Sequence, residues 1–273
     1  MTIRRSLTSI SAYVILVILG LFFLVPLLWP ILTSFNPSGS LSVAIPRPFS
    51  LINYQTIITN GIVARPFANS LILAVPTMLL VIILAGLAAY PLSRYQFRLK
   101  GPLMYGILFI SSLPILALVT PLYVMYTSLN LIDTYQGVIL FFVASALPFS
   151  IWLMKNFLDS VPFELEEAAW IDGASTFQGL FRIVLPIAAP GIAVVGVWSF
   201  LIAWTNFFVP FIILTNPDFF PASVHIYNFF GAYGQVNYGQ LAAYAMLYAL
   251  PAVVLYTLVS RFFVRGVSGG LKG

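Results

Sequence analysis

Long stretches without a charged residue dominate this chain and limit what it can fold into. The six longest uncharged stretches are residues 6–46, 66–93, 101–132, 134–154, 183–217 and 219–260. Each can hold the roughly 20 apolar residues that a helix needs to cross the hydrocarbon core of a bilayer. With 61% hydrophobic and 7% charged residues, the composition excludes a soluble protein. It predicts an all-α membrane protein with six spanning helices.

The uncharged stretches also give expected boundaries. We expect the spans at about 12–35, 67–91, 103–129, 136–157, 184–214 and 240–262. A short interfacial helix is expected near Leu51 to Thr59, and the last external loop at about 216–239. The whole chain, 1–273, is expected to form a single transmembrane domain. Its tail, about 264–273, is expected to be too rich in glycine for a stable helix.

The positions of the basic residues predict the orientation in the membrane. In the six-span arrangement, ten of the 12 fall on one side: Arg4, Arg5, Arg94, Arg98, Lys100, Lys155, Arg182, Arg261, Arg265 and Lys272. Only Arg47 and Arg65 fall on the other. The positive-inside rule therefore predicts a multi-pass protein with both termini in the cytoplasm. The net charge of +5 is explained by this topology and gives no reason to expect nucleic-acid binding.

One segment between the fourth and fifth spans, about 159–186, holds five of the seven acidic residues. Pro162 suits the first turn of a helix, which would place Glu164, Glu166 and Glu167 near the positive end of the helix dipole. Apolar residues recur at helical spacing and are expected to lie on the opposite side. These residues are Phe163, Trp170, Ala174, Phe177 and Phe181.

A turn is expected in the middle of this acidic segment. Gly173 interrupts the helix, and Ser175 with Gln178 has the spacing of a capping box for a second short helix. The expected shape is an L-shaped, acidic, amphipathic protrusion. The alternative is an interfacial helix lying on the membrane, but such helices usually carry Lys and Arg on their polar face.

The order of residues in this segment resembles a known motif. Glu167, Ala168 and Ala169 are followed four residues later by Gly173, and then by Leu185-Pro186. This pattern resembles the EAA loop of bacterial ABC importer permeases. The resemblance implies a type I ABC importer permease fold, in which the loop is a cytoplasmic coupling helix that docks on the ATPase subunit. It implies these coupling residues: Glu166, Glu167, Ala168, Ala169, Asp172, Gly173, Ala174, Phe177, Leu185 and Pro186.

Two of these residues have specific roles in the family that the chain resembles. The glutamate that matches Glu167 pairs with a basic residue of the ATPase, and the glycine that matches Gly173 lets the loop bend into the ATPase cleft. The alternatives are a surface carboxylate that stabilises the helix dipole and an ordinary turn glycine.

Further pieces resemble the carbohydrate-uptake branch related to the smaller permease of the maltose importer. They include Asn69-Ser70-Leu71, Pro148-Phe149, and Trp204 to Asn206. The resemblance implies a permease subunit for a di- or oligosaccharide or a related solute in a bacterial or archaeal plasma membrane. It implies four kinds of partner: a second homologous permease, two ATPase subunits, an extracytoplasmic solute-binding protein and the sugar. In the family the tail lies along the ATPase dimer; the alternative is a disordered end.

A few polar and aromatic residues within the spans are candidates for a sugar path. An aromatic face packs against a pyranose ring, and an amide can serve its hydroxyl groups. The candidates are Tyr123, Tyr126, Trp204, Thr205 and Asn206. The alternative is that they serve helix packing, through hydrogen bonds between helices and through interfacial anchoring.

The sequence argues against other classes of function. It has no cysteine, a single histidine, His225, and no glycine-rich phosphate-binding loop, so we expect no metal site, no cofactor and no catalysis by this chain. The alternative function is an autonomous secondary carrier or channel for a polar solute. Carriers driven by protons or sodium usually keep ionisable groups at mid-membrane, and the predicted spans hold none there. ATP hydrolysis by a partner fits better.

Overall fold

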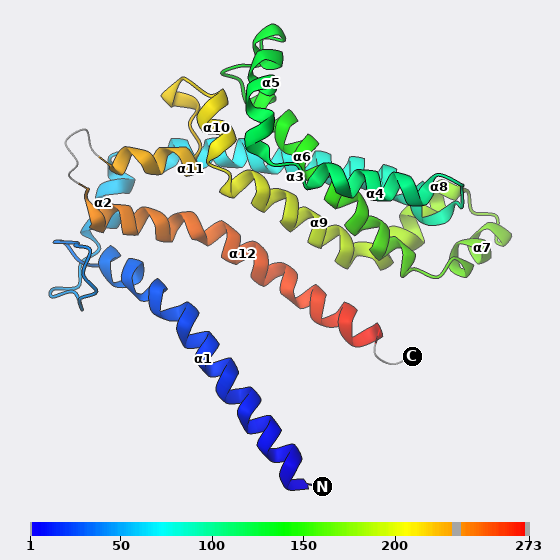
Figure 1. The fold of residues 1–273 in the computed structure, drawn as a ribbon, viewed down its shortest axis with the longest axis horizontal. Helices are drawn as coiled ribbons and strands as arrows, with labels where there is room; N and C mark the ends of the chain where they lie inside the picture. The colour runs from blue at the N-terminus through cyan, green and yellow to red at the C-terminus, as the bar shows by residue number, and fades with distance from the viewer. Residues whose placement is uncertain (1, 231–235, 271–273) are drawn as a thin grey trace. The chain divides into compact units, whose positions relative to one another are not determined.

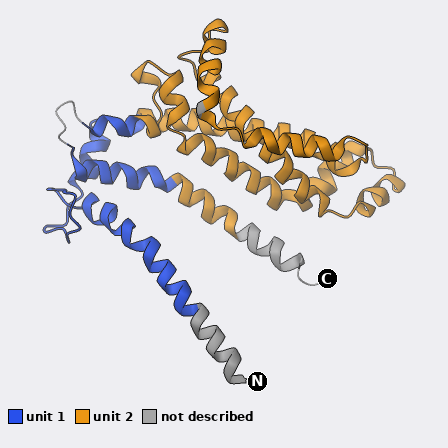
Figure 2. Ribbon diagram, viewed as in Figure 1, with its two compact units in different colours: residues 1–64, 225–250 blue, residues 65–224, 251–273 orange. Residues whose placement is uncertain are grey.

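The computed structural model describes residues 2–230 and 236–270, with side chains described for 13–115, 117–230 and 236–260. Within these ranges the chain is helical, and the only β-type pairing is an isolated bridge between Phe230 and Val236 (Figure 1). This confirms the predicted all-α class. The chain divides into two compact units, Met1–Ala64 with His225–Leu250 and Arg65–Val224 with Pro251–Gly273 (Figure 2).

The first unit contains α1 (Thr2–Ser34), α2 (Ile52–Thr59) and the beginning of α12 (Tyr238–Gly270). Helix α2 is the short helix expected near Leu51 to Thr59. The Asn53 side chain in α2 is buried, and its Nδ2 donates to the carbonyl oxygens of Ser34 (3.1 Å) and Asn36 (2.9 Å). These bonds satisfy the carbonyl groups where α1 ends.

The second unit contains the elements around the acidic segment. Its helices are α3 (Ala64–Arg94), α4 (Lys100–Ser111), α5 (Ile115–Ser128), α6 (Tyr135–Asp159), α7 (Glu164–Ile171), α8 (Thr176–Gly179), α9 (Leu185–Thr205), α10 (Phe208–Ile213), α11 (Ala222–His225) and the part of α12 after Leu250. Helix α6 packs against α4 and α9. Small residues such as Ala85, Ala89 and Ala146 are fully buried in the core that α3, α6 and α9 form. Small side chains let helix backbones approach closely, which favours association in lipid.

Five helices in the described part of the chain are long and apolar enough to cross a membrane. They are Tyr13–Ser34, Ala64–Arg94, Tyr135–Asp159, Thr176–Thr205 and Tyr238–Ser260. They correspond to the predicted first, second, fourth, fifth and sixth spans. The predicted third span, 103–129, consists of two shorter helices, α4 and α5.

The interruptions of the predicted spans have local causes. Helix α4 ends before Pro114, because proline lacks an N–H and disfavours helix in the residue before it, and Pro114 itself is extended (ψ 127°) just before α5. The fifth span starts earlier than predicted, at Thr176, and stops at Thr205 because Asn206 is extended (ψ 119°).

The C-terminal prediction was wrong in one respect. Helix α12 continues to Gly270, through most of the tail that was expected to be non-helical. Extending an existing helix gains one hydrogen bond for each residue fixed, which offsets the low helix propensity of glycine. The last part of the predicted tail, 271–273, and residues 231–235 of the predicted external loop lie outside the described residues.

Candidate functional site

The acidic segment folds as two short helices joined by a glycine turn. Helix α7 begins at Glu164, close to the predicted start at Pro162, and has three glutamates in its first turn. At its end, Gly173 N donates to Trp170 O (3.1 Å) and Ala174 N donates to Ala169 O (2.9 Å). This is the Schellman pattern of helix termination, and Gly173 has the positive φ (+88°) that the pattern requires. The predicted turn at Gly173 is present.

The second helix starts with the predicted capping box. Gln178 N donates to Ser175 Oγ (3.3 Å), and Ser175 N donates to Gln178 Oε1 (2.9 Å). Helix α8 then passes through a π-helical turn, Leu180–Val184, into α9. The turn and α8 are therefore continuous with the fifth span. We call residues 163–186 the coupling segment.

Most of the predicted coupling residues are accessible. Those exposed are Glu167, Ala168, Asp172, Gly173, Phe177 and Pro186, and those half-buried are Ala169, Ala174 and Leu185. Phe177 stacks on Phe181 with ring centroids 5.6 Å apart, and Phe163 meets Trp170 edge-on at the same distance. Each of these four aromatic residues is more than a third exposed. The coupling segment therefore presents both carboxylates and aromatic rings to the surface, and exposed aromatic rings are typical of an interface.

Glu166 departs from the prediction that all three glutamates lie on a polar surface. It is fully buried, and its Oε1 lies 2.5 Å from Arg94 Nε of α3. Tyr90 OH donates to Glu166 Oε2 (2.8 Å). Glu166 is three residues after Phe163 and four before Trp170, so it lies between these two partly exposed rings on one face of the helix, the face that Arg94 of α3 contacts. Arg94, which the sequence marked only as an indicator of orientation, is thus its buried partner.

Two of the predicted sugar-path residues lie in the interior. Tyr126 and Trp204 are each 1% exposed. Tyr126 OH donates to Gly137 O (3.0 Å), and the Trp204 ring stacks on Phe200 at 5.5 Å. This burial favours the alternative interpretation, in which the aromatic residues pack between helices and do not line a sugar path.

The other candidates lie near the ends of helices. Thr205 is exposed, and its Oγ1 donates to Leu201 O (2.7 Å). The half-buried Asn206 accepts a hydrogen bond at Oδ1 from Val209 N (3.0 Å) in the first turn of α10. This bond ties Asn206 to the first turn of α10 and occupies one lone pair of its amide oxygen.

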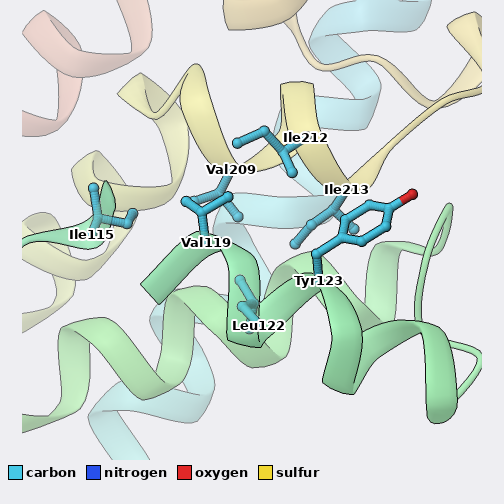
Figure 3. A pocket seen from close by; sticks show the side chains of 7 residues that line it. All are labelled: Ile115, Val119, Leu122, Tyr123, Val209, Ile212 and Ile213. Carbon is cyan, nitrogen blue, oxygen red and sulfur yellow. The ribbon is translucent and has the colours of Figure 1, made fainter. Parts of the chain in front are cut away.

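Tyr123 borders a small pocket between α5 and α10 (Figure 3). The other residues that line it are Ile115, Val119, Leu122, Val209, Ile212 and Ile213. Figure 3 shows the aliphatic side chains of the two helices facing each other, with the Tyr123 ring beside them. The pocket measures about 10 Å³, the space of a single water molecule. It is too small and too apolar to hold a sugar ring.

A polar network that sequence reasoning did not predict anchors the chain after α10. Asn69 Nδ2 donates to Asp218 O (2.8 Å) and Phe220 O (3.0 Å), and Tyr135 OH donates to Asn69 Oδ1 (2.7 Å). Arg65 forms an ion pair with Asp218 at 2.8 Å. These contacts fasten the segment after α10 to α3 and to the start of α6.

Asp133 is a second anchor of the same segment. It has φ +58°, and its Oδ1 accepts from Asn216 N and Thr215 N, both at 2.9 Å. The hydrogen bond from Asn216 and then those from Thr215 lower the pKa of Asp133 below its usual 3.8, against the opposing effect of burial. The carboxylate is thus stabilised in its charged form, in a turn outside the spans.

We expect Asp133→Asn to lower the melting temperature of the detergent-solubilised protein by about 2–4 °C at neutral pH. Asparagine tolerates the positive φ, so the change removes mainly the charge. Since the pKa is lowered in the folded state, the contribution of Asp133 is fully present above pH 3.8 and is lost as the pH falls through the lowered pKa. The difference between wild type and variant should therefore shrink below pH 3.8, and a difference independent of pH would contradict this account.

No group of three or more His, Cys, Asp or Glu side chains in the described ranges is arranged to hold a metal ion.

The model of the family described as "Binding-protein-dependent transport system inner membrane component" matches residues 81–268. The chain belongs to this family. The match extends from α3 through the coupling segment into α12. Members are ABC importer permeases, transmembrane subunits without catalytic activity, so the expectation that this chain is not an enzyme is confirmed.

Individual relatives of the permease match over nearly their whole length. A diacetylchitobiose uptake permease of Streptomyces coelicolor is 30% identical over 97% of this chain and 89% of its own. A maltodextrin transport permease of Streptococcus pneumoniae is 30% identical, covering 99% and 98%. A chain of a bacterial ABC transporter involved in alginate import has the same fold, with a TM-score of 0.79, 20% identity and coverage of 94% and 96%. The predicted ABC importer permease fold is confirmed.

Proposed function

We propose that this permease forms, with a second homologous permease, the translocation pathway of an ATP-driven importer for a di- or oligosaccharide or a related solute. Two observations support the sugar class. The relatives at 30% identity are named for diacetylchitobiose and maltodextrin, and the structural match is named for alginate import. An extracytoplasmic binding protein delivers the sugar, in keeping with the description of the family.

The coupling segment is the observation that carries the proposed mechanism. It exposes both Glu167 and the aromatic rings of Phe177 and Phe181, and α8 is continuous with the fifth span. In our proposal the two ATPase subunits bind the coupling segments of the two permeases. Closure of the ATPases on ATP displaces the coupling segments, and the attached spans change from an inward-facing to an outward-facing arrangement.

This mechanism requires a defined orientation in the membrane. The coupling segment and both termini lie in the cytoplasm, where ATP is available, and the basic residues are distributed as the positive-inside rule requires. The segment after α10, anchored by Asn69 and Asp133, lies on the external side. There it is available to the sugar-binding protein.

Reversing one exposed charge of α7 tests the docking surface. We expect Glu167→Arg to reduce co-purification of the ATPase in mild detergent by about tenfold or more, because a charge-assisted contact becomes a repulsion. Glu164→Arg is the matched control, since Glu164 is also an exposed glutamate in the first turn of α7. It should retain the ATPase. Equal loss in both variants, or in neither, would show that Glu167 has no specific role.

Two further results would overturn the proposal as a whole. One is elution of wild type without an ATPase, and the other is transport of solute by proteoliposomes that contain only this chain. Together they would support the alternative of a self-sufficient carrier. The sugar class is tested with the assembled importer and its binding protein, by uptake of radiolabelled maltodextrin and diacetylchitobiose. A neutral amino acid serves as the control solute.

A further inference from the structure

Helix α7 is attached to the helices around it by a carboxylate. Glu166 is its only buried residue, while its apolar members Leu165 and Ile171 are 41% and 86% exposed. A buried charge is costly unless it is paired and hydrogen-bonded. The contacts of Glu166 therefore decide how α7 is held.

Both partners of Glu166 come from one face of α3. Tyr90 and Arg94 are four residues apart, one helical turn, and each contacts a different oxygen of the carboxylate. The Arg94 side chain is 7% exposed. Its guanidinium carbon lies 5.9 Å from the centre of the Phe163 ring, just before α7. Three contacts thus fix the direction of α7 relative to the end of α3.

Ser93, the neighbour of Arg94, joins the same end of α3 to α6. Ser93 Oγ donates to Asp159 Oδ1 (2.7 Å), and Lys155 pairs with the other oxygen of Asp159. The last two residues of α3 therefore contact the helix before the coupling segment and the first helix within it. A displacement of α7 has a direct polar route into α3.

The buried pair is not the arrangement that stability alone would favour. Arg94 Nη2 is buried without an acceptor among the described residues, and the close contact of Arg94 Nε with Glu166 Oε1 lacks the geometry of a hydrogen bond. Apolar replacement of a buried ion pair is often neutral or stabilising, so the pair is poorly explained as a stabilising device. An apolar contact, however, is non-directional and would let α7 slide. The Arg94–Glu166 ion pair, together with the hydrogen bond from Tyr90 to the other carboxylate oxygen, gives α7 a fixed orientation.

We propose that the Arg94–Glu166 pair is the internal link that passes movement of α7 to α3, and that Glu166 is a positioning residue within the chain while its neighbour Glu167 faces the ATPase. This inference rests on the proposed function of the coupling segment. It assigns opposite tasks to two adjacent glutamates. It also makes Arg94, 72 residues earlier, a part of the coupling machinery.

A distance measurement on the isolated permease tests the link without the ATPase. The chain has no cysteine, so spin labels can be placed uniquely at Leu79→Cys on α3 and Ile171→Cys on α7, both exposed positions. We expect a narrow distance distribution in wild type and in the control Glu164→Gln. We expect a broad one in Arg94→Met. An unchanged distribution in Arg94→Met would overturn the link.

Transport measurements on the assembled importer give the second test. We expect Arg94→Met and Glu166→Gln each to reduce the solute transported per ATP by about tenfold, with the ATPase still bound, because one buried charge is left unpaired. Arg94→Lys should recover part of the ratio, since it restores the charge. A lower yield of the purified variants with an unchanged ratio of solute transported to ATP hydrolysed would mean a structural role only and would overturn the proposal. Absence of the ATPase from wild type would instead refute the proposed function, and the distance measurement would still decide the link.

Discussion

Gly173→Val is expected to uncouple ATP hydrolysis from transport while leaving the permease inserted and folded. Gly173 has φ +88°, a conformation that a β-branched residue adopts only under strain. The cost of such a conformation is about 1–3 kcal/mol. A Cβ at this position would meet no atom within 4 Å in the chain, so the penalty comes from the backbone alone. The turn would open, and α8 would leave the direction that the Schellman hydrogen bonds fix.

The measured quantity is ATP hydrolysis stimulated by the solute-loaded binding protein, in proteoliposomes containing the whole importer. If the full strain energy opposes the working orientation of the docking surface, the stimulated ATP hydrolysis should fall by about 5–150-fold. Gly61→Val is the matched control, because Gly61 also has a positive φ (+71°) and open space where a Cβ would lie, but it is in the turn after α2. Equal loss in both variants would show general damage rather than a specific effect on coupling.

Signals close together in the sequence predicted the coupling segment well. Gly173, Ser175 and Gln178 act within a few residues of one another, so their turn and capping box could be read directly from the chain. Five of the six predicted spans match long apolar helices for the same reason. The division of the third span was signalled by Pro114, which limits helix formation locally.

Contacts between distant residues were not predicted, because local rules explain each residue equally well without them. All three glutamates of α7 suit the first turn of a helix, and this hid the burial of Glu166. The spacing of Glu166 from Phe163 and Trp170 was one available signal. The four-residue spacing of Tyr90 and Arg94 at the end of a span was another. Tyr126 and Trp204 illustrate the same limit, since an aromatic residue in a span suits both a sugar path and a core.

Gly191→Ala is expected to cause a large loss of stability by disturbing the packing of α9 on α6. A Cβ at Gly191 would lie 2.2 Å from Phe157 Cγ and 2.4 Å from its Cβ, so α9 and α6 could not keep their separation. Overpacking of this kind costs about 1–3 kcal/mol, which thermal unfolding in detergent can measure. Gly196→Ala, on the same helix, is the control. Its nearest neighbour is the flexible end of Ile82 at 3.2 Å, so little change is expected.

The contact of Gly191 with Phe157 also bears on coupling. Phe157 lies two residues before the end of α6, and Gly191 lies near the start of α9, so the contact holds together the two helices that flank the coupling segment. Phe157→Ala, which removes the Cγ atom at 2.2 Å and the ring beyond it, should restore part of the stability of Gly191→Ala, giving a non-additive pair. Strictly additive effects would mean that the two residues do not limit each other. If stability and ATP coupling recover together in the double variant, then close packing of α6 on α9 is what keeps the coupling segment in its working orientation.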